Sequence, residues 1–440
     1  MRTTLDWKDL KEGDIFKVIM PRLALRNIFW RGSSTLYTLR DHVISLVENP
    51  SLEITKHPSH PQANSSIQGA VQPVRCLDSL PPVKIFEALM DRVNRYTGSD
   101  PEIFVVRGSE HKTLLPAFRF LPTQETQQKA HPRGGVIGNI DQTLTAYAYR
   151  DGFAAECFIH PVHCHGFLIN YLRDGLLNVL KAAQTFDRTA KLTIKNTFTI
   201  PEITMRNAAE EDIALGCMPS QNAYDDSPNL PIAARNFHLR FAGGHIHFDI
   251  LPAGRGRNNL IEMVRACDVL AAIPAVAIFA SIDSPLRRQF YGRAGEYRTP
   301  KYGLEYRVLS NAWLATPEVA HLILNLTRVG LKVGRSGFRH LLDIDEQAAR
   351  DIINYCDVKA ARKYVLDHIN MFHVLLAGDG VYRDKDTDAG FKRIIEGGIE
   401  AIFPDFEDLA SNWKLNQNWF GESNNGAAFW GTLCRRLPKA

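Results

Sequence analysis

The sequence lacks an apolar run long enough to cross a membrane. Its longest apolar stretch, residues 269–280, has 12 residues and contains Pro274, whereas a transmembrane helix needs about 20. The first residues, MRTTLDWKDLKEGD, are too acidic and too interrupted for a signal peptide. We therefore expect a cytoplasmic protein that has no membrane partner.

Paired cysteines and the common nucleotide-binding loops are also missing. The seven cysteines are scattered and form no CxxC pair, which argues against a disulfide framework or a cysteine zinc site. No Walker-type glycine loop, GxSxG motif or dinucleotide fingerprint occurs. The chemistry of the protein must therefore be sought in other patterns.

Neither sign of charge is in large excess. The chain has 52 basic and 48 acidic residues, a formal net charge of +4. This balance does not indicate a nucleic-acid partner, although a balanced total can hide a local basic patch. With 45% hydrophobic and 23% charged residues, the composition is that of a soluble globular protein, and 440 residues predict about two to three folding units.

Periodicity and turn residues predict an α+β fold. One helix is expected where Val83, Phe86, Met90 and Val93 share a stripe, ending near Gly98. Alternating runs predict strands at 103–106, 143–149, 153–159, 191–200, 237–250 and 303–309. The Asp-Gly pair at 151–152 predicts a hairpin. Helical patterns cover 258–280, 344–375 and 391–402, and polar stretches at 122–138 and 219–232 are expected to be loops.

Several predicted strands carry polar side chains on one face only. Alternation places His245, His247 and Asp249 opposite Ile246, Phe248 and Ile250. Glu305 and Arg307 likewise share a face, as do Asp100 and Glu102, and Glu156 faces away from its apolar neighbours. Close carboxylates repel unless a cation neutralises them. Carboxylates with one imidazole suit Mg²⁺ or Mn²⁺. The alternative is that these residues form ordinary surface ion pairs. We would prefer that alternative for any single strand, but not for four strands together.

A basic segment leads directly into the strand that bears Glu305. Residues 287–307 contain few acids and many cations, namely Arg287, Arg288, Arg293, Arg298, Lys301 and Arg307. Arginines on a loop rich in glycine can clamp phosphate oxygens, although a solvated basic loop is the common alternative. Metal-binding acids beside phosphate-binding arginines are the components of a phosphoryl-transfer site.

Four blocks of sequence resemble the phage-encoded carboxylate–amine ligases, which belong to the glutamine synthetase and glutamate–cysteine ligase superfamily. The blocks are GSDPEIFV (98–105), DGFAAECFI (151–159), AGGHIHFDI (242–250) and RRQFYGRAGEYRTPKYGLEYRVLSNAWL (287–314). The resemblance covers residues 96–320 and implies a curved antiparallel sheet, backed by helices, that holds ATP and two or three Mg²⁺ or Mn²⁺ ions.

The resemblance also implies a role for each matching residue. The implied metal ligands are Asp100, Glu102, Glu156, His245 and Glu305. The residues expected at the transferred phosphate are Arg293, Arg298 and Arg307, and those expected at the nucleotide are His247, Arg287 and Arg307. The chain then divides into an N-terminal extension and linker (1–75), a glutamine synthetase-like catalytic core (76–320) and a helical C-terminal region (321–440).

Two features depart from the family pattern. The segment GCMPSQNAY has Met218 and Ser220 where relatives tend to have acids, so a metal or substrate role for that loop is in doubt. The cluster His160, His163, Cys164 and His165 follows Glu156. It could bind a transition metal, but its spacing favours a substrate-pocket or structural loop.

These patterns together predict an ATP-dependent ligase that joins a carboxylate to an amine through an acyl phosphate. The substrates, small or carried by a macromolecule, and the oligomeric state stay open, and the two polar loops are candidate lids. Three alternatives remain: a guanidino or amine kinase with the same core, a binding protein with an inactive site, and a nucleic-acid-tailoring ligase that acts on a modified base.

Overall fold

The computed structural model describes residues 3–4, 53–54, 94–108, 113–126, 146–162, 165–213, 220–225, 237–250, 254–337, 339–378 and 385–416. The predicted helix over residues 83–93 lies outside these residues. So do most of both candidate lids, as well as Met218, His163 and Cys164.

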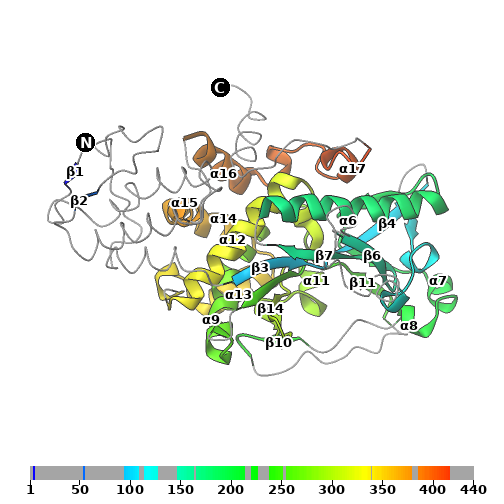
Figure 1. Cartoon of the computed structure of the whole chain (residues 1–440), viewed down its shortest axis with the longest axis horizontal. Coiled ribbons are helices and arrows are strands. Elements are labelled where there is room, and N and C mark those ends of the chain that lie inside the picture. Colours follow the sequence, from blue (N-terminus) through cyan, green and yellow to red (C-terminus); the bar gives the residue numbers. More distant parts are fainter. Residues whose placement is uncertain are drawn as a thin grey trace.

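An open antiparallel sheet forms the centre of the described part of the chain (Figure 1). Its ten strands are β3 (Asn94–Ser99), β4 (Glu102–Arg107), β5 (Thr113–Leu115), β6 (Ala146–Asp151), β7 (Ala154–Val162), β8 (Lys191–Thr193), β10 (Gln221–Asn222), β12 (Ile246–Ile250), β13 (Glu296–Arg298) and β14 (Gly303–Tyr306). The main path runs β10-β13-β14-β12-β3-β7-β4-β5, with β6 on β7 and β8 on β4. Two small pairs join β1 (Thr3–Thr4) to β2 (Glu53–Ile54) and β9 (Thr197–Thr199) to β11 (Leu239–Phe241).

Helices cover one face of this sheet and make up the C-terminal part of the described chain. In Figure 1, α6 (His165–Phe186) and α12 (Pro317–Arg335) run across the same side of the strands. The other α-helices are α7 (Glu202–Arg206), α8 (Glu210–Ile213), α9 (Arg257–Cys267), α10 (Ile273–Ile278), α11 (Pro285–Phe290), α13 (Glu346–Asn354), α14 (Val358–Asp367), α15 (Ile369–Gly378), α16 (Lys385–Gly397) and α17 (Leu409–Asn412). A π-helical turn, η7 (Asp268–Ala272), joins α9 to α10, and 3₁₀ turns lie at η3 (Ala117–Arg119), η8 (Asn311–Leu314), η9 (Arg339–Leu342) and η10 (Ile399–Ala401). These elements confirm the predicted α+β class and the helical C-terminal region. In the described residues, no helix combines the length and apolarity that a membrane span requires.

The alternation read from the sequence sets which face of the sheet is buried. Ile246, Phe248 and Ile250 of β12 are fully buried, whereas His247 and Asp249 are only half-buried. Burying such an apolar side chain contributes about 1.5–3 kcal/mol. The apolar face joins a hydrophobic core whose residues range from Ile103 to Leu415. The predicted division of the chain at residues 75 and 320 stays a prediction.

A proline interrupts the strand that crosses the middle of the sheet. Both β3 and β4 pair with β7, and Asp100 and Pro101 lie between them. Proline has no N–H to donate to the ladder, so regular pairing stops here. The two strands therefore act as one long strand with a local irregularity at Asp100.

The predicted strand over residues 237–250 is two strands in different sheets. β11 ends at Phe241, and β12 begins at Ile246. Between them, Gly244 packs so tightly that a Cβ would lie 2.2 Å from Nε1 of Trp313, and this Nε1 donates to the Gly244 carbonyl at 3.0 Å. Residues 191–200 divide likewise into β8 and β9, and residues 94–98 are strand rather than the end of a helix.

A buried carboxyl group supports β14 from the apolar side of the sheet. Asp268, at the start of the π-helical turn, is fully buried and accepts a 2.6 Å hydrogen bond from the Tyr306 hydroxyl. Burial raises the pKa of Asp268 to about 7, against the lowering effect of this hydrogen bond. Tyr306 is the last residue of β14, between Glu305 and Arg307, so Asp268 anchors the end of the strand next to both.

Asp268 should make the protein less stable as the pH rises from about 4 to about 7. In this window the folded protein keeps a proton that the unfolded chain releases, and the slope can reach about 1.4 kcal/mol per pH unit. The Asp268→Asn variant should therefore show a shallower decline in the free energy of unfolding, measured by urea denaturation across this range. An unchanged slope would show that Asp268 does not titrate in this way.

Candidate active site on the polar face of the sheet

The strand register aligns the predicted site residues in two rows across the sheet. In the first row, Glu156 of β7 lies directly opposite Glu102 of β4 on one side and Tyr149 of β6 on the other. In the second row, Glu305 of β14 lies between His247 of β12 and Arg298 of β13. Side chains directly opposite each other have Cβ atoms about 4.5–5.5 Å apart, so each row is a contact group.

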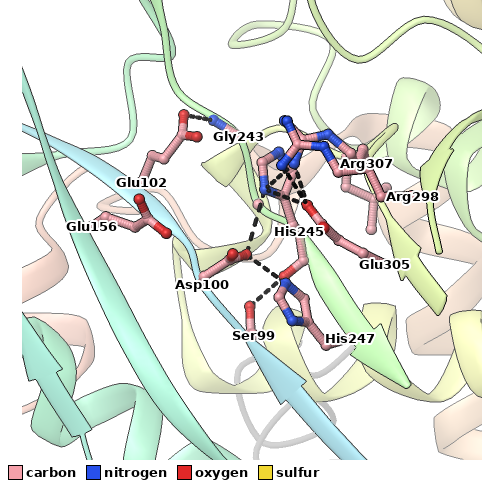
Figure 2. A network of polar contacts seen from close by, with 12 residues as sticks. Ser99, Asp100, Glu102, Glu156, Gly243, His245, His247, Arg298, Glu305 and Arg307 are labelled. Carbon is pink, nitrogen blue, oxygen red and sulfur yellow. Dashed lines mark hydrogen bonds and ion pairs between the residues drawn. The ribbon is translucent and has the colours of Figure 1, made fainter. Parts of the chain in front are cut away.

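Asp100 and His245 connect the two rows (Figure 2). Asp100 lies between the Glu102–Glu156 pair and the group formed by His245, Glu305 and Arg307. Its Oδ1 is 2.8 Å from Nε2 of His247 and 3.4 Å from Nδ1 of His245. The same Nδ1 is 3.6 Å from Oε1 of Glu305. All the predicted metal ligands therefore gather on one face of the sheet.

Asp100, His245 and Glu305 have the arrangement of a cation site. One ligand atom from each lies within 4.8 Å of the others. Burial lowers the pKa of His245 to about 4, and the Arg307 charge acts in the same direction, so the ring is neutral at pH 7 and able to ligate a metal. Burial alone would raise the pKa of Asp100, but His247 and His245 lower it below its ordinary value. Two carboxylates and a neutral imidazole fit a divalent cation.

Three further acids, Glu102, Asp151 and Glu156, lie next to Asp100 on the polar face. Burial, followed by the Asp151 charge, raises the pKa of Glu102 to about 7. The pKa of Glu156 rises well above its usual range because the side chain is buried and faces Asp100, Asp151 and Glu102. Two like charges 4 Å apart repel by about 4 kcal/mol at an intermediate dielectric constant. This cluster therefore favours either protonation or bound cations.

Asp151 is a member of this cluster that the sequence analysis did not identify. It ends β6 at the confirmed β6–β7 hairpin, and burial raises its pKa while the Arg307 charge opposes the rise. An aspartate before glycine is common in hairpin turns. The turn was therefore a sufficient explanation for Asp151, and the sequence held no separate sign of a role in the site.

Two arginines bring positive charge to the other side of Asp100. Arg307 is buried, donates a short hydrogen bond to Oε1 of Glu305 and lies 3.3 Å from Nδ1 of His245. Arg298 approaches the same Oε1 at 3.7 Å. A carboxylate beside two guanidinium groups and an imidazole stays ionised, and the pKa of Glu305 is accordingly lowered against the effect of burial, chiefly by Arg307.

Three tyrosines hold the polar side chains in place, and the sequence analysis identified none of them. Tyr149 donates to Oε1 of Glu156 at 2.6 Å. Tyr291 donates to Oε1 of Glu102 at 2.7 Å. The Tyr302 hydroxyl is 2.5 Å from Nδ1 of His247, and its ring stacks on that imidazole. Tyr291 and Tyr302 belong to the block at 287–314, in which only charged residues were predicted to have a role.

Arg287 differs from its predicted role at the nucleotide. Its guanidinium is fully buried and donates to the carbonyl oxygens of Ala242, Val308 and Leu309. Gly292, with φ +71°, packs against it so closely that a Cβ would lie 2.6 Å from the guanidinium nitrogens. A guanidinium occupied by backbone carbonyls supports the loop rather than a phosphate. Arg293 is half-buried in the turn between α11 and β13, and its predicted role stays a prediction.

The histidine cluster after Glu156 is only partly described. His160 is half-buried on β7. His165 is buried at the start of α6, where its Nδ1 lies 3.1 Å from Oδ1 of Asn325 on α12. This contact joins two helices that cover the sheet, which is consistent with the structural alternative for His165.

Part of the chain matches a family of ligases. Residues 231–349 match the family model described as phage phiEco32-like COOH.NH2 ligase-type 2, which confirms the resemblance to phage-type carboxylate–amine ligases. The match supports a carbon–nitrogen ligase, and the matched segment contains His245, Glu305 and Arg307. No curated protein and no solved structure matches the chain.

Manganese should stabilise the folded protein through Asp100. A ligand that binds only the native state adds about 2.7 kcal/mol at 100 times its Kd. Thermal unfolding followed by circular dichroism should therefore show a Tm that rises with Mn²⁺ and a smaller rise for Asp100→Asn. Asp249→Asn is the matched control, because Asp249 also lies on the polar face but pairs with Arg255 at 3.5 Å. Equal shifts for all three proteins would contradict a metal site at Asp100.

Proposed function

We propose that this protein is an ATP-dependent ligase that forms an amide from a carboxylate and an amine through an acyl phosphate, with Mg²⁺ or Mn²⁺ bound. The proposal rests on one observation. The acidic side chains that could hold cations and the arginines that could hold a phosphate are in contact on one face of the sheet. There Glu305 touches the Arg307 guanidinium and lies within 3.6 Å of His245. The ligase-family match over residues 231–349 supports the joining of a carboxylate to an amine.

The acidic residues would hold the cations. Asp100, His245 and Glu305 fit one ion, and Glu102 and Glu156, paired across β4 and β7, would serve further ions to a total of two or three. Bound there, such ions would neutralise phosphate charge and act as Lewis acids. We place the protein in the cytoplasm, where ATP and Mg²⁺ are supplied.

The basic residues would hold the transferred phosphoryl group. Arg307 is buried and aligned by Glu305, and Arg298 approaches from β13. Planar guanidinium groups can bind phosphate oxygens in pairs and stabilise the charge that spreads over them during transfer. His247 and the partly exposed Tyr302, stacked together, lie toward the nucleotide in this proposal, and Arg293 stays a candidate for the phosphate.

The proposed reaction has two steps, phosphoryl transfer to the carboxylate and then amide formation. An oxygen of the substrate carboxylate attacks the γ-phosphorus of ATP, forming an acyl phosphate and releasing ADP. The amine nitrogen then attacks the acyl carbon, the amide bond forms, and inorganic phosphate leaves. The amine loses a proton, which a carboxylate of the site accepts. The substrates are small molecules or groups carried by a macromolecule.

Hydroxylamine offers a direct test because it replaces the unknown amine. The protein is incubated with ATP, Mg²⁺ or Mn²⁺, hydroxylamine and a pooled carboxylate library, and hydroxamates are detected by mass spectrometry. We expect a hydroxamate together with equal amounts of ADP and inorganic phosphate. Glu305→Gln should abolish product while the circular dichroism spectrum stays native, because the substitution removes a metal ligand and leaves the apolar face intact.

Other products would identify the competing functions. A phosphorylated amine without free phosphate would identify a kinase with the same core and refute the ligase. Near-full activity of Glu305→Gln would show that the metal assignment is wrong. Turnover that requires DNA or RNA, with a steep salt dependence, would indicate the nucleic-acid-tailoring ligase.

The Arg307→Lys variant should lose rate rather than nucleotide affinity. Lysine keeps the charge but not the planar pair of donors, so stabilisation of the transition state should decline more than binding of ATP. We expect kcat to fall about 100-fold or more, with a much smaller change in KM for ATP. Arg257→Lys, at an exposed position at the start of α9, is the control. Equal losses in kcat for both variants, or a loss confined to KM, would contradict the role of Arg307.

A further inference from the structure

We propose that Tyr291 is a positioning residue that fixes the tautomer of His245, so that Nδ1 presents its lone pair to Asp100 and Glu305. Tyr291 follows α11 and is outside the set of residues that the charge pattern selected. The inference rests on the proposed metal role of His245, and it does not depend on which carboxylate or amine is the substrate.

The Tyr291 hydroxyl has three polar neighbours. It is 2.7 Å from Oε1 of Glu102, 2.7 Å from Nε2 of His245 and 3.3 Å from a guanidinium nitrogen of Arg307. A phenol has one proton to donate and two lone pairs to accept with. An arginine only donates, so Arg307 must use one of the lone pairs.

Glu102 decides where the phenolic proton goes. Its second oxygen, Oε2, accepts the backbone N–H of Gly243 at 2.7 Å, and its Oε1 lies 2.7 Å from the Tyr291 oxygen in the position of an acceptor. Tyr291 therefore donates to Glu102. The remaining lone pair of the hydroxyl faces Nε2 of His245, which must then carry the proton and donate to Tyr291.

The other ring nitrogen of His245 is consequently unprotonated. Its Nδ1 lies 3.3 Å from a guanidinium nitrogen of Arg307, so a proton on Nδ1 would point at another donor. Its distances to the oxygens of Asp100 and Glu305 are 3.4 and 3.6 Å, longer than the 2.9–3.0 Å typical of an N–H···O bond. Without a metal this lone pair faces the Arg307 N–H, and a cation held by Asp100 and Glu305 would use the same lone pair in its place. Fixing of a ligand's tautomer by an outer partner is a general property of histidine metal sites.

The packing around Tyr291 holds the hydroxyl at this point. A Cβ on Gly243 would lie 2.5 Å from Nε2 of His245 and 2.8 Å from the Tyr291 oxygen, so only glycine leaves room for their contact. The guanidinium groups of Arg287 and Arg307 lie 5.4 and 5.6 Å from the centre of the Tyr291 ring. The buried Arg287 thus serves the site by supporting this ring.

The tautomer can be measured directly. Full-length protein labelled with ¹⁵N-histidine is freed of metal and recorded at about pH 8. Long-range ¹H–¹⁵N spectra distinguish a protonated from an unprotonated ring nitrogen, and His245→Gln identifies the signals of His245. We expect the proton on Nε2 in the wild type. Tyr291→Phe should shift it to Nδ1 or give a mixture.

Tyr149→Phe is the matched control, because Tyr149 makes the equivalent bond to Glu156 and should leave the His245 tautomer unchanged. Tyr291→Phe should also weaken Mn²⁺ binding about 10–100-fold, measured by electron paramagnetic resonance. A wild-type spectrum with the proton on Nδ1 overturns the proposal, whether or not the variant folds, and so does a Tyr291→Phe protein that keeps the wild-type tautomer. None of these readouts uses ATP or turnover, so a protein without ligase activity but with the expected tautomer would refute the proposed function alone.

Discussion

Repulsion between acids on one face of the sheet is the constraint on which the rest of the structure depends. The register sets Glu102 directly opposite Glu156, and Asp100 and Asp151 act on the same pair. Close like charges are costly at intermediate dielectric constants, so a protein that keeps them must provide countercharges and hydrogen-bond donors. Arg307, the histidines and the tyrosines provide them, and a bound cation would complete the neutralisation.

The remainder of the fold keeps this arrangement rigid. The apolar face of β12 is fully buried, and Asp268 fixes Tyr306 from the helical side. The buried Arg287 and Arg288 bind the backbone of the 308–309 segment and, through Arg288, the carboxylate of Asp283. Such a scaffold holds a polar site without collapse, because Asp268, Arg287 and Arg288 each bind a buried partner.

Alternation along single strands was sufficient to predict which residues share the polar face. His245, His247, Glu305 and Arg307 lie there as expected, because a period of two follows from strand geometry alone. Register was not predictable, since the pairing of Glu102 with Glu156, or of His247 with Glu305, depends on long-range contacts. The helix predicted from the apolar stripe that ends at Val93 was extended too far, to about Gly98. Local periodicity could not show that residues 94–99 form a strand that pairs with β12 and β7.

Partners of the charged residues were harder to predict than the residues themselves. Tyr149, Tyr291 and Tyr302 contribute one hydroxyl each, and nothing in their local sequence separates them from core aromatics. Arg287 showed the opposite difficulty, because an arginine in a basic loop looks like a phosphate ligand until its burial against Ala242 and Leu309 is known. Both cases depend on tertiary contacts, which a single sequence does not contain.

Anomalous diffraction from crystals soaked in Mn²⁺ tests most directly whether the polar face binds divalent cations. We predict an anomalous peak within bonding distance of Asp100, Glu305 and Nδ1 of His245. Crystals of fully soaked protein with no manganese at these three side chains would contradict the account.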